Sequence, residues 1–141
     1  MTLAPLPETM RAVVLTGFGG FERLEYRSDW PVPVPGAGEV LIRVGGAGVN
    51  NTDINTRIGW YSPAVEGSTG SGGASGFAET EGEGWSGEQF TFPRIQGIDA
   101  AGRIVAVGEG VSPERIGERV LVEPALRRAD GSVDFLSLIH I

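Results

Sequence analysis

Apolar residues recur in short runs along this chain, and each run has the length of a β-strand. Five runs predict strands, at residues 10–15, 21–26, 40–44, 98–107 and 119–122. The turn residues Thr-Gly-Phe-Gly-Gly stand between the first two runs, so these predict a β-hairpin. The run at 40–44 gives the clearest strand, and glycines at positions 45, 46 and 48 interrupt the row of side chains after it.

One short helix is predicted over residues 51–58, which would form about two turns. Asn50 or Asn51 can cap this helix, Asp53 stands near the positive end of its dipole, and Gly59 ends it. No long amphipathic helix is predicted elsewhere. The pattern therefore indicates a mainly β domain in the form of a small barrel.

Three stretches are predicted to lie outside the strands. Residues 1–9 form a loose leader. Residues 30–36 carry a proline at every second position, which removes hydrogen-bond donors, so we expect an extended surface segment. Residues 65–89 are rich in Gly, Ser, Thr and Glu and predict a flexible insertion. This insertion is either a solvated loop or a lid or partner-binding segment anchored by Trp85.

The composition is that of one globular domain, with 40% hydrophobic and 21% charged residues in 141. We place this domain at residues 10–135. No apolar run is long enough to cross a bilayer and no basic, apolar leader opens the chain, so we expect a cytoplasmic protein without a membrane partner. The net charge of −7 argues against a nucleic-acid partner, because phosphate neutralisation requires clustered Lys and Arg.

Two features limit the chemistry of cofactors and metals. The chain has no cysteine and a single histidine, His140, whereas zinc sites use thiolates and imidazoles above all. We therefore expect no zinc, and we give His140 no role. The glycines at positions 17, 19 and 20 lack the third glycine of a dinucleotide-binding turn, so we attribute them to the hairpin.

A polar stretch formed by Asn50, Asn51, Thr52 and Asp53 follows the clearest strand. Two amides, a hydroxyl and a carboxylate can bond to the local backbone in an Asx-type turn or a helix cap. The same groups can also begin a binding site. The residues alone leave both interpretations open.

Three blocks of the sequence, in order, resemble the N-terminal, GroES-like catalytic domain of the medium-chain dehydrogenase/reductase superfamily. They are GEVLIRVGGAGVNNTD from Gly38, FPRIQGIDAAGRIVAVGEGV from Phe92 and IGERVLV from Ile116. This superfamily includes zinc alcohol dehydrogenases and quinone reductases. The resemblance implies a GroES-like, partly open β-barrel with one or two short helices, whose cleft faces a separate dinucleotide domain.

The departures from the family pattern indicate the subfamily. In the zinc alcohol dehydrogenases a cysteine ligand takes the place of Asn50, and the block G-H-E, with a histidine ligand, corresponds here to Gly97, Ile98 and Asp99. Neither an amide nor an isoleucine replaces these ligands in a tetrahedral zinc site. The chain instead resembles the zinc-free, quinone-reductase-like branch, where an Asn at this place and the pattern R-x-G-x-Y, here residues 57–61, are common.

The resemblance also implies roles for individual residues. Asn50 and Tyr61 would line the substrate cleft and donate hydrogen bonds to a carbonyl or quinone oxygen. Thr52 stands where the zinc enzymes keep a proton-relay hydroxyl. Asp53 and Arg57 match structural positions, as a cap and an ion pair. For Tyr61 the alternative is a buried aromatic residue whose hydroxyl is satisfied within the domain.

The function implied is that of an NAD(P)H-dependent, zinc-independent oxidoreductase of quinones, enones or related carbonyls and alcohols. NADP(H) or NAD(H) would be bound mainly by a Rossmann domain, but no strand followed by G-x-G-x-x-G and a helix occurs in these residues. We therefore expect a fragment that is inactive alone, from a parent protein that forms a homodimer. Residues 136–141 do not resemble the family's continuation and are expected to be non-native, the alternative being a native apolar strand. The alternative is a non-catalytic GroES-like binding module, or a relative of the zinc enzymes whose site has decayed.

Overall fold

The computed structural model of the chain describes residues 5–62, 65–66, 68–72, 75–77, 91–123, 125–127 and 133–135. Trp85, His140 and the tail at 136–141 lie outside these residues. The strands are β1 (Thr9–Leu15), β2 (Leu24–Pro31), β3 (Val40–Ala47), β4 (Ala100–Val107), β5 (Arg119–Leu121), β6 (Ala125–Arg127) and β7 (Val133–Phe135). The helices are α1 (Asn51–Ile58), α2 (Thr69–Gly72) and the 3₁₀ turns η1 (Phe21–Arg23) and η2 (Pro113–Arg115).

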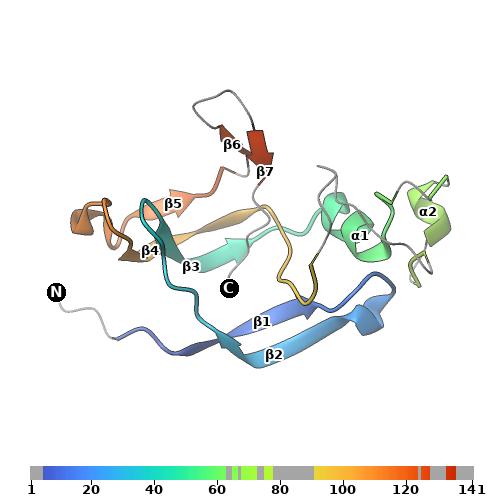
Figure 1. The fold of residues 1–141 in the computed structure, drawn as a ribbon, viewed down its shortest axis with the longest axis horizontal. Coiled ribbons are helices and arrows are strands. Elements are labelled where there is room, and N and C mark those ends of the chain that lie inside the picture. Colours follow the sequence, from blue (N-terminus) through green and yellow to red (C-terminus); the bar gives the residue numbers. More distant parts are fainter. Residues whose placement is uncertain are drawn as a thin grey trace.

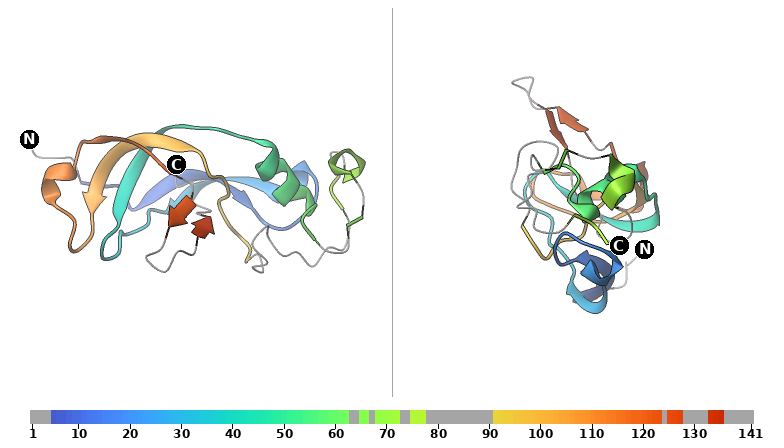
Figure 2. Two further views of the ribbon diagram at one scale, coloured as in Figure 1. Left: turned by 90° about the horizontal axis from the view of Figure 1, so that it is seen from above. Right: turned by 90° about the vertical axis from the view of Figure 1, so that its right-hand side faces the viewer.

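The strands form three antiparallel sheets (Figure 1). β1 pairs with β2, β3 and β5 flank β4, and β6 pairs with β7. The β6–β7 hairpin projects away from β1 and β2 in Figure 1 and in the right-hand view of Figure 2. The prediction of a mainly β fold with short helices is confirmed, and within the described residues the sheets are open rather than closed into a barrel.

The hydrophobic core lies between the two larger sheets and α1. Its buried side chains come from β1, β3, β4 and α1, and they are Ala12, Val14, Leu15, Leu41, Ile58, Ala100 and Ile104. Leu15 is fully buried, and its backbone N–H and C=O exchange hydrogen bonds of 2.7 and 2.9 Å with Arg94. These two bonds hold the segment before β4 against the end of β1. The burial of the Leu15 side chain and the backbone hydrogen bonds therefore both stabilise this contact.

Helix α1 has the bounds that the sequence predicts, because both of its ends carry strong local signals. The Asn50 side chain accepts from the Thr52 backbone N–H, and the Asp53 carboxylate accepts from the Asn50 N–H, which makes a capping box. At the other end Gly59 takes a left-handed conformation with φ 76°, which glycine adopts without strain. Asp53 therefore has the capping role expected of it.

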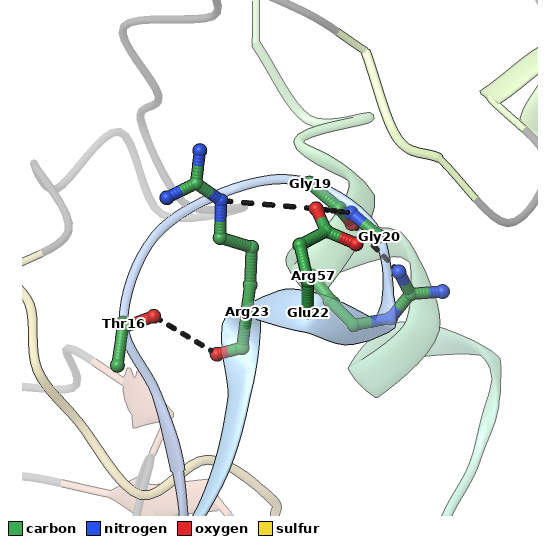
Figure 3. A network of polar contacts seen from close by, with 6 residues as sticks. All are labelled: Thr16, Gly19, Gly20, Glu22, Arg23 and Arg57. Atoms are coloured by element: carbon green, nitrogen blue, oxygen red, sulfur yellow. Dashed lines mark hydrogen bonds and ion pairs between the residues drawn. The ribbon is translucent and has the colours of Figure 1, made fainter.

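The turn between β1 and β2 differs from the prediction, which was a return strand over 21–26. Residues 21–23 form η1 instead, and β2 begins at Leu24. The reason is local hydrogen bonding. The Gly20 N–H donates to Glu22 Oε1 at 2.9 Å (Figure 3), and the Arg23 N–H donates to the Gly20 carbonyl at 3.2 Å. These bonds close a tight turn before the chain can extend.

Arg57 fixes this turn against α1 (Figure 3). Its Nη1 donates a 2.6 Å hydrogen bond to the Gly19 carbonyl, and its guanidinium lies 4.6 Å from the centre of the Phe21 ring. The side chain is only 5% exposed. The described contacts of Arg57, to a carbonyl and to an aromatic ring, are structural, and the ion pair expected for this residue stays a prediction.

Three further differences concern elements that were not predicted. The short strands β6 and β7 are not among the five strands expected from the sequence. The four-residue helix α2 lies in the stretch predicted as a flexible insertion. Trp30 and Pro31 end β2, where they pair with Met10 and Thr9 at the edge of a two-stranded sheet. A proline is tolerated at the edge of a sheet because no neighbouring strand there requires a hydrogen bond from its backbone nitrogen, which carries no hydrogen.

The remaining strand predictions are close to the structure. The run at 98–107 forms β4 from Ala100, and the run at 119–122 forms β5 up to Leu121. Among the residues described, no helix has the length and apolar character needed to span a membrane.

Candidate functional site

The candidate site lies where the end of β3, the start of α1 and the segment before β4 meet. The register of β3 and β4 places Ala47 opposite Ala100, and the Gly48 N–H continues the pairing with a 3.3 Å bond to the Asp99 carbonyl. The chain then turns into α1 at Asn50. The sheet register therefore brings Asn50 and Asp99 together, although 49 residues separate them in the sequence.

The Asn50 amide is held on both sides. Its Oδ1 accepts from the Thr52 backbone N–H at 2.8 Å and also from the Thr52 hydroxyl. Its Nδ2 donates to Asp99 Oδ2 at 3.2 Å. Two donors at the oxygen and a carboxylate at the nitrogen fix which way the amide is turned.

This arrangement leaves one donor and one acceptor for a ligand. An amide nitrogen carries two N–H groups, and the bond to Asp99 uses one of those of Asn50. Asp99 is exposed, and within the described part of the chain its Oδ1 accepts no hydrogen bond. The site can therefore hold an oxygen atom at Asn50 and an O–H or N–H group at Asp99.

Hydrogen bonds hold the start of helix α1 at the candidate site. The Asn50 N–H donates to Asp53 Oδ2 at 2.9 Å, and Gln96 Nε2 donates to the Asp53 carbonyl at 2.9 Å. Gln96 Oε1 is buried and makes no hydrogen bond to the described residues. The segment before β4 thus contacts α1 through Gln96 as well as through Asp99.

Gly48 leaves space for the Asp99 carboxylate. A Cβ atom at position 48 would lie 3.2 Å from Asp99 Oδ2 and 3.3 Å from Asp99 Cβ. Both distances are shorter than an ordinary carbon contact. The absence of a side chain at Gly48 therefore allows the carboxylate to reach Asn50.

Of the three predicted site residues, the structure brings Asn50 and Thr52 into contact. Tyr61 follows the other end of α1, an eight-residue helix about 12 Å long. Its ring is half-buried and meets Trp60 edge-on, with ring centres 5.3 Å apart. The placement of Tyr61 fits either a cleft residue or the alternative of a packed aromatic residue.

The groups around Asn50 do not fit the zinc site of the alcohol dehydrogenases. Asn50 turns its nitrogen toward Asp99, its oxygen already accepts two hydrogen bonds, and Ile98 has no donor atom. The described part of the chain contains no group of three or more His, Cys, Asp or Glu residues that could hold a metal ion. One carboxylate does not make a tetrahedral site of nitrogen and sulfur ligands.

Comparison with known proteins gives the family. The model of the alcohol dehydrogenase GroES-like domain matches residues 36–135. The chain belongs to this family. The expected resemblance and the GroES-like fold class are therefore confirmed.

Curated relatives of this GroES-like domain include two kinds of protein. The rat synaptic vesicle membrane protein VAT-1 homolog is 34% identical over 114 residues, which is 80% of this chain and 22% of that protein. The quinone oxidoreductase of Lama guanicoe is 36% identical over 111 residues, which is 79% of this chain and 26% of that protein. The chain thus spans about a quarter of the length of these relatives.

Solved structures agree with this placement. A Sinorhizobium meliloti 1021 protein assigned as an alcohol dehydrogenase is 44% identical, with a TM-score of 0.76 over 94% of this chain and 35% of its own. A thermostable alcohol dehydrogenase of Pyrobaculum aerophilum, 30% identical with a TM-score of 0.56 over 85% of this chain and 28% of its own, was solved with cobalt and zinc. Relatives of this domain thus include a metal-binding enzyme and quinone oxidoreductases.

Asp99 and Gln96 contact the candidate site, and neither contact was predicted from the sequence. For Asp99 a signal was available. It directly follows Ile98, which corresponds to a histidine ligand of the zinc enzymes, and Asn50 corresponds to a cysteine ligand of the same metal. Two ligands of one metal must lie close together, so a contact between Asn50 and the residues beside Ile98 could have been predicted.

Proposed function

We propose that this chain is the N-terminal catalytic domain of an NAD(P)H-dependent, zinc-independent oxidoreductase. Its substrates are quinones, enones or related carbonyls, or the corresponding alcohols. The observation that supports this most is the Asn50 amide, held by Thr52 and Asp99 with one N–H group left over. The chain that carries this amide belongs to a family whose members include quinone oxidoreductases.

The role proposed for Asn50 follows from the chemistry of carbonyl reduction. When bound, the reduced nicotinamide supplies the hydride and is itself oxidised. The carbonyl oxygen gains negative charge as its double bond to carbon opens, and it finally takes a proton from a hydroxyl group or water. An N–H group that is already oriented toward the oxygen stabilises this charge without further rearrangement.

Thr52 is proposed to act first as a positioning residue. Its hydroxyl and its backbone N–H both donate to Asn50 Oδ1, so they turn the Asn50 nitrogen away from the helix start. The role of a proton-relay hydroxyl, which the family resemblance implies, is a second proposal for the same atom. Tyr61 is proposed as a further donor to the substrate, approaching from the other end of α1.

The cofactor and assembly are part of the same proposal. We assign the binding of NADP(H) or NAD(H) mainly to residues that the longer relatives carry beyond the length of this chain. The absence of zinc is supported by the donor atoms around Asn50, which do not suit that metal. We also propose that the full-length protein is a cytoplasmic homodimer.

The test is an assay of the full-length protein with a panel of quinones and enones. Oxidation of NADH and NADPH is followed by absorbance, and the metal content of the same preparation is measured by mass spectrometry. We expect turnover of at least one substrate class without stoichiometric zinc. Stoichiometric zinc that is required for turnover would contradict the zinc-independent assignment. Failure to bind either cofactor would favour a non-catalytic binding module.

A further inference from the structure

A carboxylate stands beside the amide that is proposed to hold the substrate oxygen. Asp99 Oδ2 lies 3.2 Å from Asn50 Nδ2, and the Asp99 side chain is exposed. Within the described residues Asp99 forms no ion pair, since the three pairs found there join other residues. The negative charge at this site is therefore not neutralised by a neighbouring Lys or Arg in the part of the chain described.

The position of this carboxylate is set by the backbone. The Gly48 N–H donates to the Asp99 carbonyl at 3.3 Å, and Ala100, the next residue, pairs with Ala47 in the sheet. Gly48 also leaves the space that the Asp99 side chain occupies. The sheet register and the space at Gly48 thus hold the Asp99 carboxylate beside the Asn50 amide.

We propose that Asp99 determines substrate specificity, and this inference rests on the proposed function. The preferred substrates are uncharged carbonyl compounds with a hydroxyl group on the adjacent carbon. The carbonyl oxygen accepts from the Asn50 N–H, and the hydroxyl donates to Asp99 Oδ1. A substrate whose carbonyl carbon is bonded directly to a carboxylate, a 2-oxo acid, meets a like charge at the same place and is disfavoured.

Three small ketones separate these effects, because they differ only beside the carbonyl group. Hydroxyacetone carries a hydroxyl group, pyruvate carries a carboxylate, and butanone carries a methyl group. We measure kcat/KM for each with the full-length protein and with Asp99→Asn. Asparagine keeps an acceptor oxygen for Asn50 and removes the charge.

We expect the wild-type protein to favour hydroxyacetone over butanone and butanone over pyruvate. In Asp99→Asn the ratio of kcat/KM for hydroxyacetone to kcat/KM for pyruvate should fall about tenfold at low ionic strength. The difference in this ratio between wild type and variant should shrink in about 1 M salt. The matched control is Glu109→Gln, which removes a charge at the opposite end of the eight-residue strand β4 and should leave the ratio unchanged. Equal ratios in wild type and Asp99→Asn would overturn the inference.

A second measurement does not depend on turnover. Hydroxyacetone and pyruvate are titrated into the ¹⁵N-labelled full-length protein, and the side-chain amide signal of Asn50 is followed by NMR. We expect tighter binding of hydroxyacetone in wild type and a smaller preference in Asp99→Asn. Binding preference without turnover would contradict the proposed function alone. If the protein binds or turns over these ketones but Asp99→Asn leaves the preference for hydroxyacetone over pyruvate unchanged, only the role of Asp99 is contradicted.

Discussion

Arg57 and Gly19, 38 residues apart in the sequence, exchange two hydrogen bonds. Arg57 Nη1 donates to the Gly19 carbonyl at 2.6 Å, and the Gly19 N–H donates to the Arg57 carbonyl at 2.8 Å. The pair joins the turn after β1 to the last turn of α1. Because Asn50 caps the other end of the same short helix, the orientation of the candidate site depends on this contact.

Replacing Arg57 with Met should lower the free energy of unfolding by about 2 kcal/mol. The substitution removes a charged hydrogen bond at a buried carbonyl and the contact with the Phe21 ring. Urea denaturation followed by circular dichroism measures the change. The control is Arg115→Met, which removes an exposed ion pair with Glu118 and should cost less than about 1 kcal/mol. Equal losses in the two variants would show that the Arg57 contact does not hold the helix.

Gly102 in β4 should not tolerate alanine. A Cβ atom there would lie 2.2 Å from the Arg43 carbonyl oxygen of β3, so the two strands would have to separate. We expect Gly102→Ala to lower the free energy of unfolding by about 3 kcal/mol. The control in the facing strand is Gly46→Ala, whose Cβ would meet no atom within 4 Å and which should change stability by less than about 1 kcal/mol. A thermal melt that shows no difference between the two would refute the close approach of β3 and β4.

Glu22 should make the stability of the turn depend on pH. The backbone N–H groups of Glu22 itself and of Gly20 hold the pKa of the Glu22 carboxyl below its ordinary value of 4.5. A lowered pKa stabilises the folded state above pH 4.5, and this contribution is lost as the pH falls through the lowered value. Glu22→Gln should therefore be less stable than wild type at neutral pH and approach it in acid. Glu8→Gln, a change at another exposed carboxylate, is the control, and a Glu22→Gln deficit that persists unchanged in acid would contradict this role.

The 141-residue chain alone should show no turnover and weak or no binding of NADH and NADPH. The reason is that we assign the cofactor to residues beyond this length. Titration of the chain with each cofactor, followed by nicotinamide fluorescence, measures the binding, and the full-length protein is the control. Detectable reduction of a quinone by the chain alone would falsify this assignment.

Local signals explain which parts of this fold could be predicted. Helix α1 has the predicted bounds because Asn50 and Gly59 act on the backbone beside them. The sequence prediction started β2 three residues before its observed start. The hydrogen bond from the Gly20 backbone to the Glu22 side chain closes η1 there, and the apolar pattern does not show it. The strands β6 and β7 have three residues each, too few for a distinctive alternation of apolar and polar positions.

The candidate site was predicted only in part, for a related reason. Asn50 and Thr52 are near neighbours in the sequence, so their shared turn was foreseeable. The contact of Asn50 with Asp99 depends on how β3 and β4 pair, and the register of a sheet includes two irregularities here that no local pattern shows. No local pattern therefore pointed to the acceptor beside the amide, and only the correspondence of Asn50 and Ile98 to two ligands of one metal could have indicated it.

The most direct test of the central claim is the activity of the full-length protein with Asn50→Ser. Serine keeps the helix cap, so stability should change by less than about 1 kcal/mol, but it removes the amide N–H. We predict that kcat/KM for the best quinone or enone falls about 100-fold. The matched control is Asn51→Ser, the same change at the exposed neighbouring residue, which should retain wild-type activity. Equal activity of the two variants would contradict the assignment of Asn50 as the donor to the substrate oxygen.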